Sequence, residues 1–176
     1  MTKADIEEAF KKLQLEIISS LELADGSGKF QFDEWQREEG GGGLTSVLEN
    51  GKILEKGGVN FSAVSGPLND AAAKSLGVQP GNFFATGVSL VLHPKNPMVP
   101  IIHMNIRYFE MDGGAYWFGG GIDLTPHYVN ENQAKFFHQA LKKTCDQHDP
   151  SFYPEFKIWA DDYFFIKHRN ETRGIG

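Results

Sequence analysis

Polar side chains with acid–base or anion-binding chemistry alternate along one apolar stretch in the middle of the chain. In the stretch IIHMNIRYFE, His103, Asn105 and Arg107 occupy every second position. Side chains alternate between the two faces of a strand, so these three residues share a face. The preceding stretch, GVSLVLHP, places Ser89 and His93 together in the same way. If the two strands pair with these faces together, they form a cleft floor on which Arg107 can bind a carboxylate through two parallel hydrogen bonds.

The same alternation is also typical of the solvent-exposed face of a half-buried sheet, which needs polar residues but binds no ligand. Val91 and Phe109 are apolar residues on that face, and they favour a cleft floor over open surface. The residues alone leave both interpretations open.

A glycine triplet follows the next apolar stretch, in YWFGGGIDLTPHY. Consecutive glycines let a backbone pass close to a bulky neighbour, or they mark a bend at the end of a strand. Asp123 lies just after the triplet, where its carboxylate can cap a turn or face the cleft.

Four histidines fall on predicted strands and helices: His93, His103, His138 and His168. A metal site can draw its ligands from distant segments, but histidines this widely spaced are more often separate polar residues. The chain has no phosphate-binding loop, dinucleotide fingerprint, HExxH or GxSxG motif. A nucleotide enzyme, a zinc protease and an α/β-hydrolase are therefore poorly supported.

Composition narrows the class of protein further. A length of 176 residues with 40% hydrophobic residues suits one globular domain, and a net charge of -6 argues against nucleic acid as the main partner. No apolar run approaches the roughly 20 residues of a membrane span. The first twenty residues are too acidic for a signal or transit peptide, and Cys145 is the only cysteine. Because a single cysteine fits a reducing compartment, we expect a cytoplasmic location.

Periodicity and turn signals predict helices at both ends of the sequence and strands between them. Helix starts are predicted at the capping box Thr2–Asp5, at Asn69, at Asn130 and near Pro154, with the last helix containing His168. Strands are predicted at Phe30–Gln36, Val59–Val64, Phe83–Leu92, Ile101–Glu110 and Ala115–Phe118, with an Asn50-Gly51 type I′ hairpin inside Leu44–Lys56. Short connections force antiparallel pairing of the three central strands. The predicted fold class is therefore α+β, an antiparallel sheet covered by helices.

Several long motifs in one order resemble the oxygen-dependent coproporphyrinogen III oxidases. They are GVSLVLHPKNPMVPIIHMNIRYFE, WFGGGIDLTPHY, FFHQALKKTCD and DDYFFIKHRNETRGIG. The resemblance runs from about Gly57 to the last residue, with a looser match before it, and it implies a flat antiparallel sheet sandwiched by helices in a homodimer. The implied activity converts two propionates of coproporphyrinogen III to vinyl groups with dioxygen as oxidant. It gives protoporphyrinogen IX, carbon dioxide and hydrogen peroxide in haem synthesis.

The resemblance also implies roles for individual residues. Positions assigned to substrate binding match Ser89, Asn105, Ile106 and Arg107. His103 matches the proton donor, and Asp123 matches an aspartate proposed to act at the pyrrole nitrogens. Histidines assigned to a divalent cation in bacterial members match His93, His103, His138 and His168. The family reaction is described as needing no metal or organic cofactor, and a metal-bound histidine is not a free proton donor, so we expect no required cofactor.

The sequence stops at Gly176, where the family continues. We therefore expect residues 1–176 to form a single domain truncated at its C-terminus. Two alternatives remain open: a non-catalytic truncated relative that binds tetrapyrroles, and a metal-dependent oxygenase that uses the histidines. The last helix is predicted to carry Trp159, Tyr163, Phe164 and Phe165, which is more aromatic surface than one buried face can use, and this predicts an exposed interface.

Overall fold

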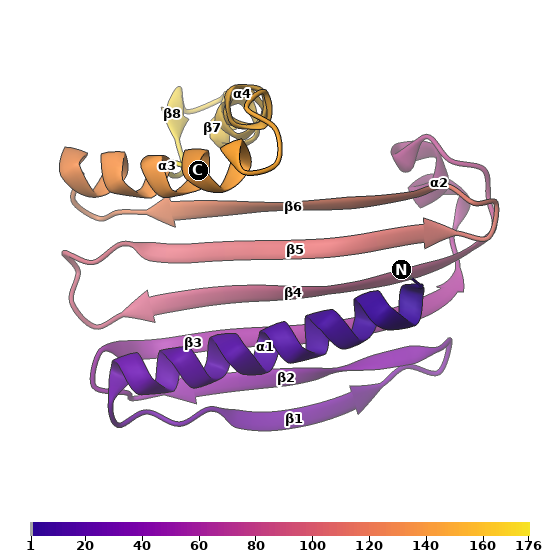
Figure 1. Cartoon of the computed structure of the whole chain (residues 1–176), viewed down its shortest axis with the longest axis horizontal. Coiled ribbons are helices and arrows are strands. Elements are labelled where there is room, and N and C mark those ends of the chain that lie inside the picture. The colour runs from indigo at the N-terminus through magenta and orange to yellow at the C-terminus, as the bar shows by residue number, and fades with distance from the viewer. Residues whose placement is uncertain (1) are drawn as a thin grey trace.

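The computed structural model describes residues 2–176, and it shows one broad antiparallel sheet with helices at both ends of the chain (Figure 1). Its helices are α1 (Lys3–Asp25), α2 (Asp70–Leu76), α3 (Glu131–Asp146) and α4 (Phe152–Phe164). Its strands are β1 (Gln31–Gln36), β2 (Gly41–Glu49), β3 (Leu54–Pro67), β4 (Asn82–Pro94), β5 (Ile101–Met111), β6 (Tyr116–Thr125), β7 (Phe165–Ile166) and β8 (Glu171–Thr172). The predicted α+β class is confirmed.

The main sheet is a meander in which β1 to β6 lie side by side in chain order. Every neighbouring pair is antiparallel, as the short connections require. A separate two-stranded hairpin, β7–β8, follows α4. Within residues 2–176, no helix has the length and apolar character needed to cross a membrane.

Helix α1 covers one face of the sheet and packs across β3 and β4. Its start is fixed by the predicted capping box, because Thr2 and Asp5 each accept a hydrogen bond from the other's backbone N–H. It ends where Gly26 takes the left-handed conformation, with φ 82°. The buried side chains on its inner face contact the core formed by Leu48, Leu54, Val59, Phe61, Ala63, Val88, Leu90, Leu92 and Tyr108.

The end of α1 is anchored by the buried carboxylate of Asp25. This carboxylate accepts hydrogen bonds from the backbone N–H groups of Gly28, Lys52, Ile53 and Leu54 at 2.7–2.9 Å. These bonds hold the pKa of the Asp25 carboxyl far below its usual range. The bond from the Leu54 N–H lowers the pKa most. Asp25 therefore ties the helix to the β2–β3 turn as an ionised group.

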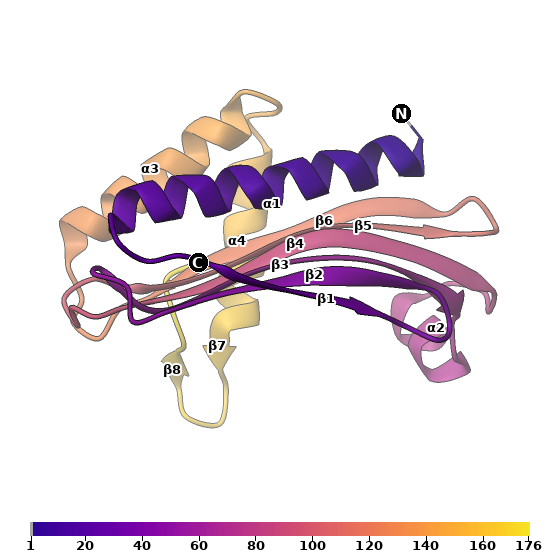
Figure 2. The same ribbon diagram turned by 90° about the horizontal axis from the view of Figure 1, so that it is seen from below.

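The β6 edge of the sheet carries the later elements. Figure 2 shows α1 and α3 on one side of the sheet, while α2 and the β7–β8 hairpin lie on the other side. Neither α3 nor α4 contains a buried residue, and Trp159 and Tyr163 are 63% and 77% exposed. The expected exposed aromatic surface on the last helix is thus confirmed.

Three local predictions were wrong. The Asn50-Gly51 turn is not of type I′: Asn50 adopts a positive φ, but Gly51 does not. The hydrogen bonds to the Asp25 carboxylate hold a wider turn there instead. The third central strand does not stop at Phe118 but continues as β6 to Thr125. The last helix ends at Phe164, so Phe165 begins β7 and His168 lies in the β7–β8 turn, where Asn170 takes a left-handed φ of 52°.

Candidate active site

The predicted polar residues lie together on the sheet face opposite α1. In the β4–β5 register, Ser89 is opposite Asn105 and Val91 is opposite His103. Arg107 is opposite Gly87. Paired residues point to the same face, so the expected alignment of the two polar faces is confirmed. We call the surface formed by these residues of β4 and β5, together with their β6 partners, the polar face.

Strand β6 extends the polar face with glycines. Gly119 is opposite Arg107, Gly121 is opposite Asn105, and Asp123 is opposite His103. A side chain at Gly121 would meet no atom within 4 Å, so there is open space beside Asn105. The glycine triplet therefore continues the strand instead of bending the chain at its end. Because Gly119 and Gly121 have no side chains, nothing projects from β6 above the backbone at this part of the polar face.

An aromatic stack borders the polar face next to Arg107. The rings of Phe83 and Phe109 lie 5.5 Å apart and parallel to within 2°, and those of Phe109 and Trp117 lie 4.6 Å apart. The sequence placed Phe109 on this face but did not predict the stack, because the diagonal neighbours depend on the strand register. The stack offers a flat apolar border to any ligand that lies on the glycine floor.

Two groups on the polar face lack partners within residues 2–176. The Oδ1 atom of Asn105 is buried and accepts no hydrogen bond. The guanidinium group of Arg107, which is exposed, forms no salt bridge in the part of the chain that the structure describes. A buried acceptor without a donor is costly, so Asn105 is poised for a donor from outside the chain.

The structure places Ile106 away from these residues. Its side chain is on the α1 face and packs against the core, as alternation along β5 requires. The predicted substrate-binding set is thus divided between two faces. Ser89, Asn105 and Arg107 line the polar face, and the Ile106 side chain does not.

Asp123 lies on the predicted face, but the residue is only 1% exposed. Its Oδ2 accepts a hydrogen bond from the Thr125 hydroxyl, and its Oδ1 accepts one from the Gly176 N–H, both at 3.0 Å. Each oxygen therefore accepts one hydrogen bond from within the chain. A role at the pyrrole nitrogens stays a prediction.

The four histidines are not brought together as a metal site. Among residues 2–176, no three His, Cys, Asp or Glu side chains form a group that could hold a metal ion. His93 and His168 are exposed on β4 and in the β7–β8 turn. The Nδ1 atom of His138, on α3, is buried without a partner, and its ring contacts Tyr153 edge-on. The residues present in this chain thus do not fit a four-histidine centre.

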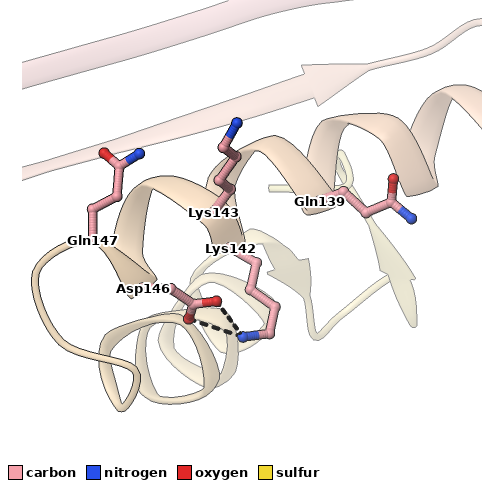
Figure 3. Close-up of a pocket in the computed structure, with 5 residues that line it drawn as sticks. All are labelled: Gln139, Lys142, Lys143, Asp146 and Gln147. Carbon is pink, nitrogen blue, oxygen red and sulfur yellow. Dashed lines mark hydrogen bonds and ion pairs between the residues drawn. The ribbon is translucent and has the colours of Figure 1, made fainter.

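Two hollows in the surface of the described residues are not lined by Ser89, His103, Asn105 or Arg107. One is formed on α3 by Gln139, Lys142, Lys143, Asp146 and Gln147 (Figure 3). There the ammonium group of Lys142 is already paired with both carboxylate oxygens of Asp146, at 2.8 and 2.7 Å. A second hollow is lined by Glu49, Asn50, Glu55, Lys56 and His93. Only His93 belongs to the predicted set, so the polar face remains the better candidate on chemistry.

Comparison with known proteins decides the family. A family model described as Coproporphyrinogen III oxidase matches residues 5–176. The chain belongs to this family. The oxygen-dependent coproporphyrinogen-III oxidase of Drosophila melanogaster is 52% identical over 178 residues, which cover 94% of this chain and 46% of that protein.

Relatives from distant organisms are about equally similar. The mitochondrial oxygen-dependent coproporphyrinogen-III oxidase of Homo sapiens is 49% identical over 99% of this chain and 41% of its own length. The oxygen-dependent coproporphyrinogen-III oxidase of Prochlorococcus marinus (strain NATL1A) is 49% identical over 99% of this chain and 51% of its own length. The chain thus spans about half the length of the curated relatives it matches.

Proposed function

We propose that residues 1–176 are part of a single coproporphyrinogen oxidase domain that binds coproporphyrinogen III on the polar face. The proposed reaction is the oxidative decarboxylation of two propionates to vinyl groups with dioxygen, which gives protoporphyrinogen IX in haem synthesis. Family membership and the names of the relatives support this activity.

The observation that carries the proposal is the unpartnered Oδ1 of Asn105, which lies between Arg107 and His103 along the same strand face. A buried amide oxygen needs a hydrogen-bond donor. A porphyrinogen carries pyrrole N–H donors at its centre and carboxylates at its rim. It therefore supplies a partner for Asn105 and, through a propionate, a partner for Arg107.

The surrounding residues fit a broad tetrapyrrole. Gly119 and Gly121 keep the floor low, so the macrocycle can approach the backbone of β6. The Arg107 guanidinium group holds one propionate by charge-assisted hydrogen bonds, and the Ser89 hydroxyl adds a neutral one. The stack of Phe83, Phe109 and Trp117 covers apolar ring edges. Together these contacts orient the propionate that reacts.

Each decarboxylation step balances with dioxygen alone. A hydride equivalent leaves the propionate carbon attached to the ring, and the bond to the carboxylate breaks to release carbon dioxide. The electrons of that bond form the vinyl double bond. Dioxygen takes up the two electrons and two protons and becomes hydrogen peroxide. His103, on the polar face, is the residue that we assign as proton donor to the reduced oxygen.

Three further features belong to the proposal. No metal or organic cofactor is required, because the electron-rich porphyrinogen reacts with dioxygen itself. The working form is a homodimer, which the exposed aromatic side chains of α4 support. The location is cytoplasmic, which a single free cysteine, Cys145, supports. Similar relatives carry the names mitochondrial and chloroplastic.

Product chromatography tests the activity. The chain and a full-length relative are incubated with coproporphyrinogen III in air and under nitrogen. We expect protoporphyrinogen IX only in air, and substrate binding by the chain in both conditions. Binding without conversion by the chain would favour the non-catalytic tetrapyrrole-binding alternative, and absence of both would refute the proposal.

A further inference from the structure

The segment Arg173–Gly176 lies against the outer edge of β6. The N–H of Ile175 donates to the Leu124 carbonyl at 3.0 Å, and the N–H of Gly176 donates to the Asp123 carboxylate at 3.0 Å. The N–H of Arg173 donates to the Phe164 carbonyl at 2.9 Å. The bonds of Ile175 and Gly176 hold the segment against β6, next to the residue pair that contains His103, and the bond of Arg173 ties the start of the segment to the end of α4.

Gly174 is in close contact with the Asp123 carboxylate. A side-chain carbon at residue 174 would lie well inside van der Waals contact of both carboxylate oxygens. Since Asp123 is 1% exposed, its side chain has no free volume into which it can retreat. The backbone of residue 174 can therefore follow this path only as glycine.

The Asp123 carboxylate is held from its other side by Thr125. The Thr125 hydroxyl donates to Oδ2, while the Gly176 N–H occupies Oδ1. Each oxygen of this nearly buried carboxylate thus accepts a bond from the chain itself, and both oxygens lie against Gly174.

We propose that Asp123 is a positioning residue that holds Arg173–Gly176 against β6, an arrangement that we call the lock. The Thr125 hydroxyl orients its carboxylate, and Gly174, which has no side chain, leaves room for that carboxylate. The locked segment forms the wall of the polar face beside His103. The lock itself is independent of any ligand, whereas its effect on ligand binding rests on the proposed function.

Hydrogen exchange of the chain without ligand tests the lock directly. A hydrogen-bonded amide exchanges more slowly than a free one, so protection of Gly176 reports its bond to Asp123. We expect Asp123→Ala and Gly174→Ala each to speed exchange at Ile175 and Gly176 by about tenfold or more. The matched control is Gly113→Ala, because residue 113 has no atom within 4 Å of an added side-chain carbon.

A double variant separates the contact from a general loss of stability. Asp123→Ala removes the three atoms nearest to an added side-chain carbon at residue 174, so adding Gly174→Ala should change exchange at Gly176 no further. Additive effects of the two substitutions, or unprotected amides in the wild-type chain, would overturn the lock.

Binding of coproporphyrin III, followed by its fluorescence, distinguishes positioning from direct contact. Asp123→Asn keeps an acceptor for the Gly176 N–H, so it should retain both the amide protection and wild-type affinity, whereas Gly174→Ala should lose both. Loss of affinity in Asp123→Asn with protection intact would show that the carboxylate itself contacts the ligand and would overturn the proposal. Failure of the proposed function would appear differently, as wild-type protection in a chain that binds no coproporphyrin.

Discussion

Gln14 is a polar residue at the centre of the contact between α1 and the sheet, and its removal should be costly. It is 1% exposed and lies on the same helix stripe as Ile6, Phe10 and Ile18. Its amide nitrogen donates to the Leu44 carbonyl at 2.8 Å, the Val59 carbonyl at 2.9 Å and the Ser46 hydroxyl at 3.1 Å.

These acceptors lie where the β2–β3 ladder is interrupted. Pairing stops at Leu44 opposite Phe61 and resumes at Val47 opposite Gly58. Gln14 satisfies the carbonyls left in that gap, and the Asn60 side chain accepts from the Ser46 N–H at 3.2 Å. The helix thus supplies hydrogen bonds that the sheet lacks at this point.

The size of the effect follows from the two N–H groups that Gln14 contributes. Gln14→Ala leaves two buried acceptors without donors, at about 1–2 kcal/mol each, and so should lower the free energy of unfolding by about 3 kcal/mol. For a chain of this length, that loss corresponds to a fall in Tm of roughly 6–12 °C. Gln14→Leu fills the volume without restoring the bonds and should lose nearly as much.

Thermal unfolding in dilute solution, followed by circular dichroism, measures the difference. Leu15→Ala is the matched control on the same helix, since Leu15 is 52% exposed and its loss should change stability by less than about 0.5 kcal/mol. Equal Tm values for Gln14→Ala and Leu15→Ala would refute the account of the interrupted ladder.

Three other predictions concern pH, metal and association. Because the folded-state pKa of Asp25 is lowered, its contribution to stability is present above pH about 4 and is lost as pH falls through the folded-state pKa. Asp25→Asn should therefore flatten the loss of stability in acid, measured by urea unfolding at a series of pH values. An unchanged dependence of the unfolding free energy on pH would contradict this. Exhaustive chelation should leave conversion of coproporphyrinogen intact in an active full-length relative, whereas restoration by a stoichiometric divalent ion would make the histidines a working metal site. The exposed aromatic side chains of α4 should cause the isolated chain to associate at high concentration, so a monodisperse monomer in size-exclusion chromatography would count against this interface.

Local signals predicted the parts of the fold that depend on neighbouring residues. The capping box at Thr2 and the Asn69 cap of α2 both lie within a few residues of the groups that they satisfy. The shared face of His103, Asn105 and Arg107 followed from the two-residue period of a strand.

Features that depend on distant partners could not be predicted in this way. A glutamine on an amphipathic helix indicates exposure, and only contacts 30 to 45 residues away place Gln14 in the core. The same holds for Asp25, whose partners in the β2–β3 turn turned an expected type I′ hairpin into a wider loop. The four histidines match positions that the family resemblance assigns to a metal, but the folded chain does not bring three of them together.

The central claim is that the polar face binds the carboxylates of a tetrapyrrole through Arg107. The most direct measurement is the Kd of coproporphyrin III for Arg107→Ala beside Arg37→Ala, a control whose guanidinium group pairs with Glu39 in the β1–β2 turn. Loss of a charge-assisted pair of about 1.5–3 kcal/mol predicts binding roughly 10- to 100-fold weaker for Arg107→Ala and unchanged for Arg37→Ala. Wild-type affinity in a well-folded Arg107→Ala chain would contradict the account.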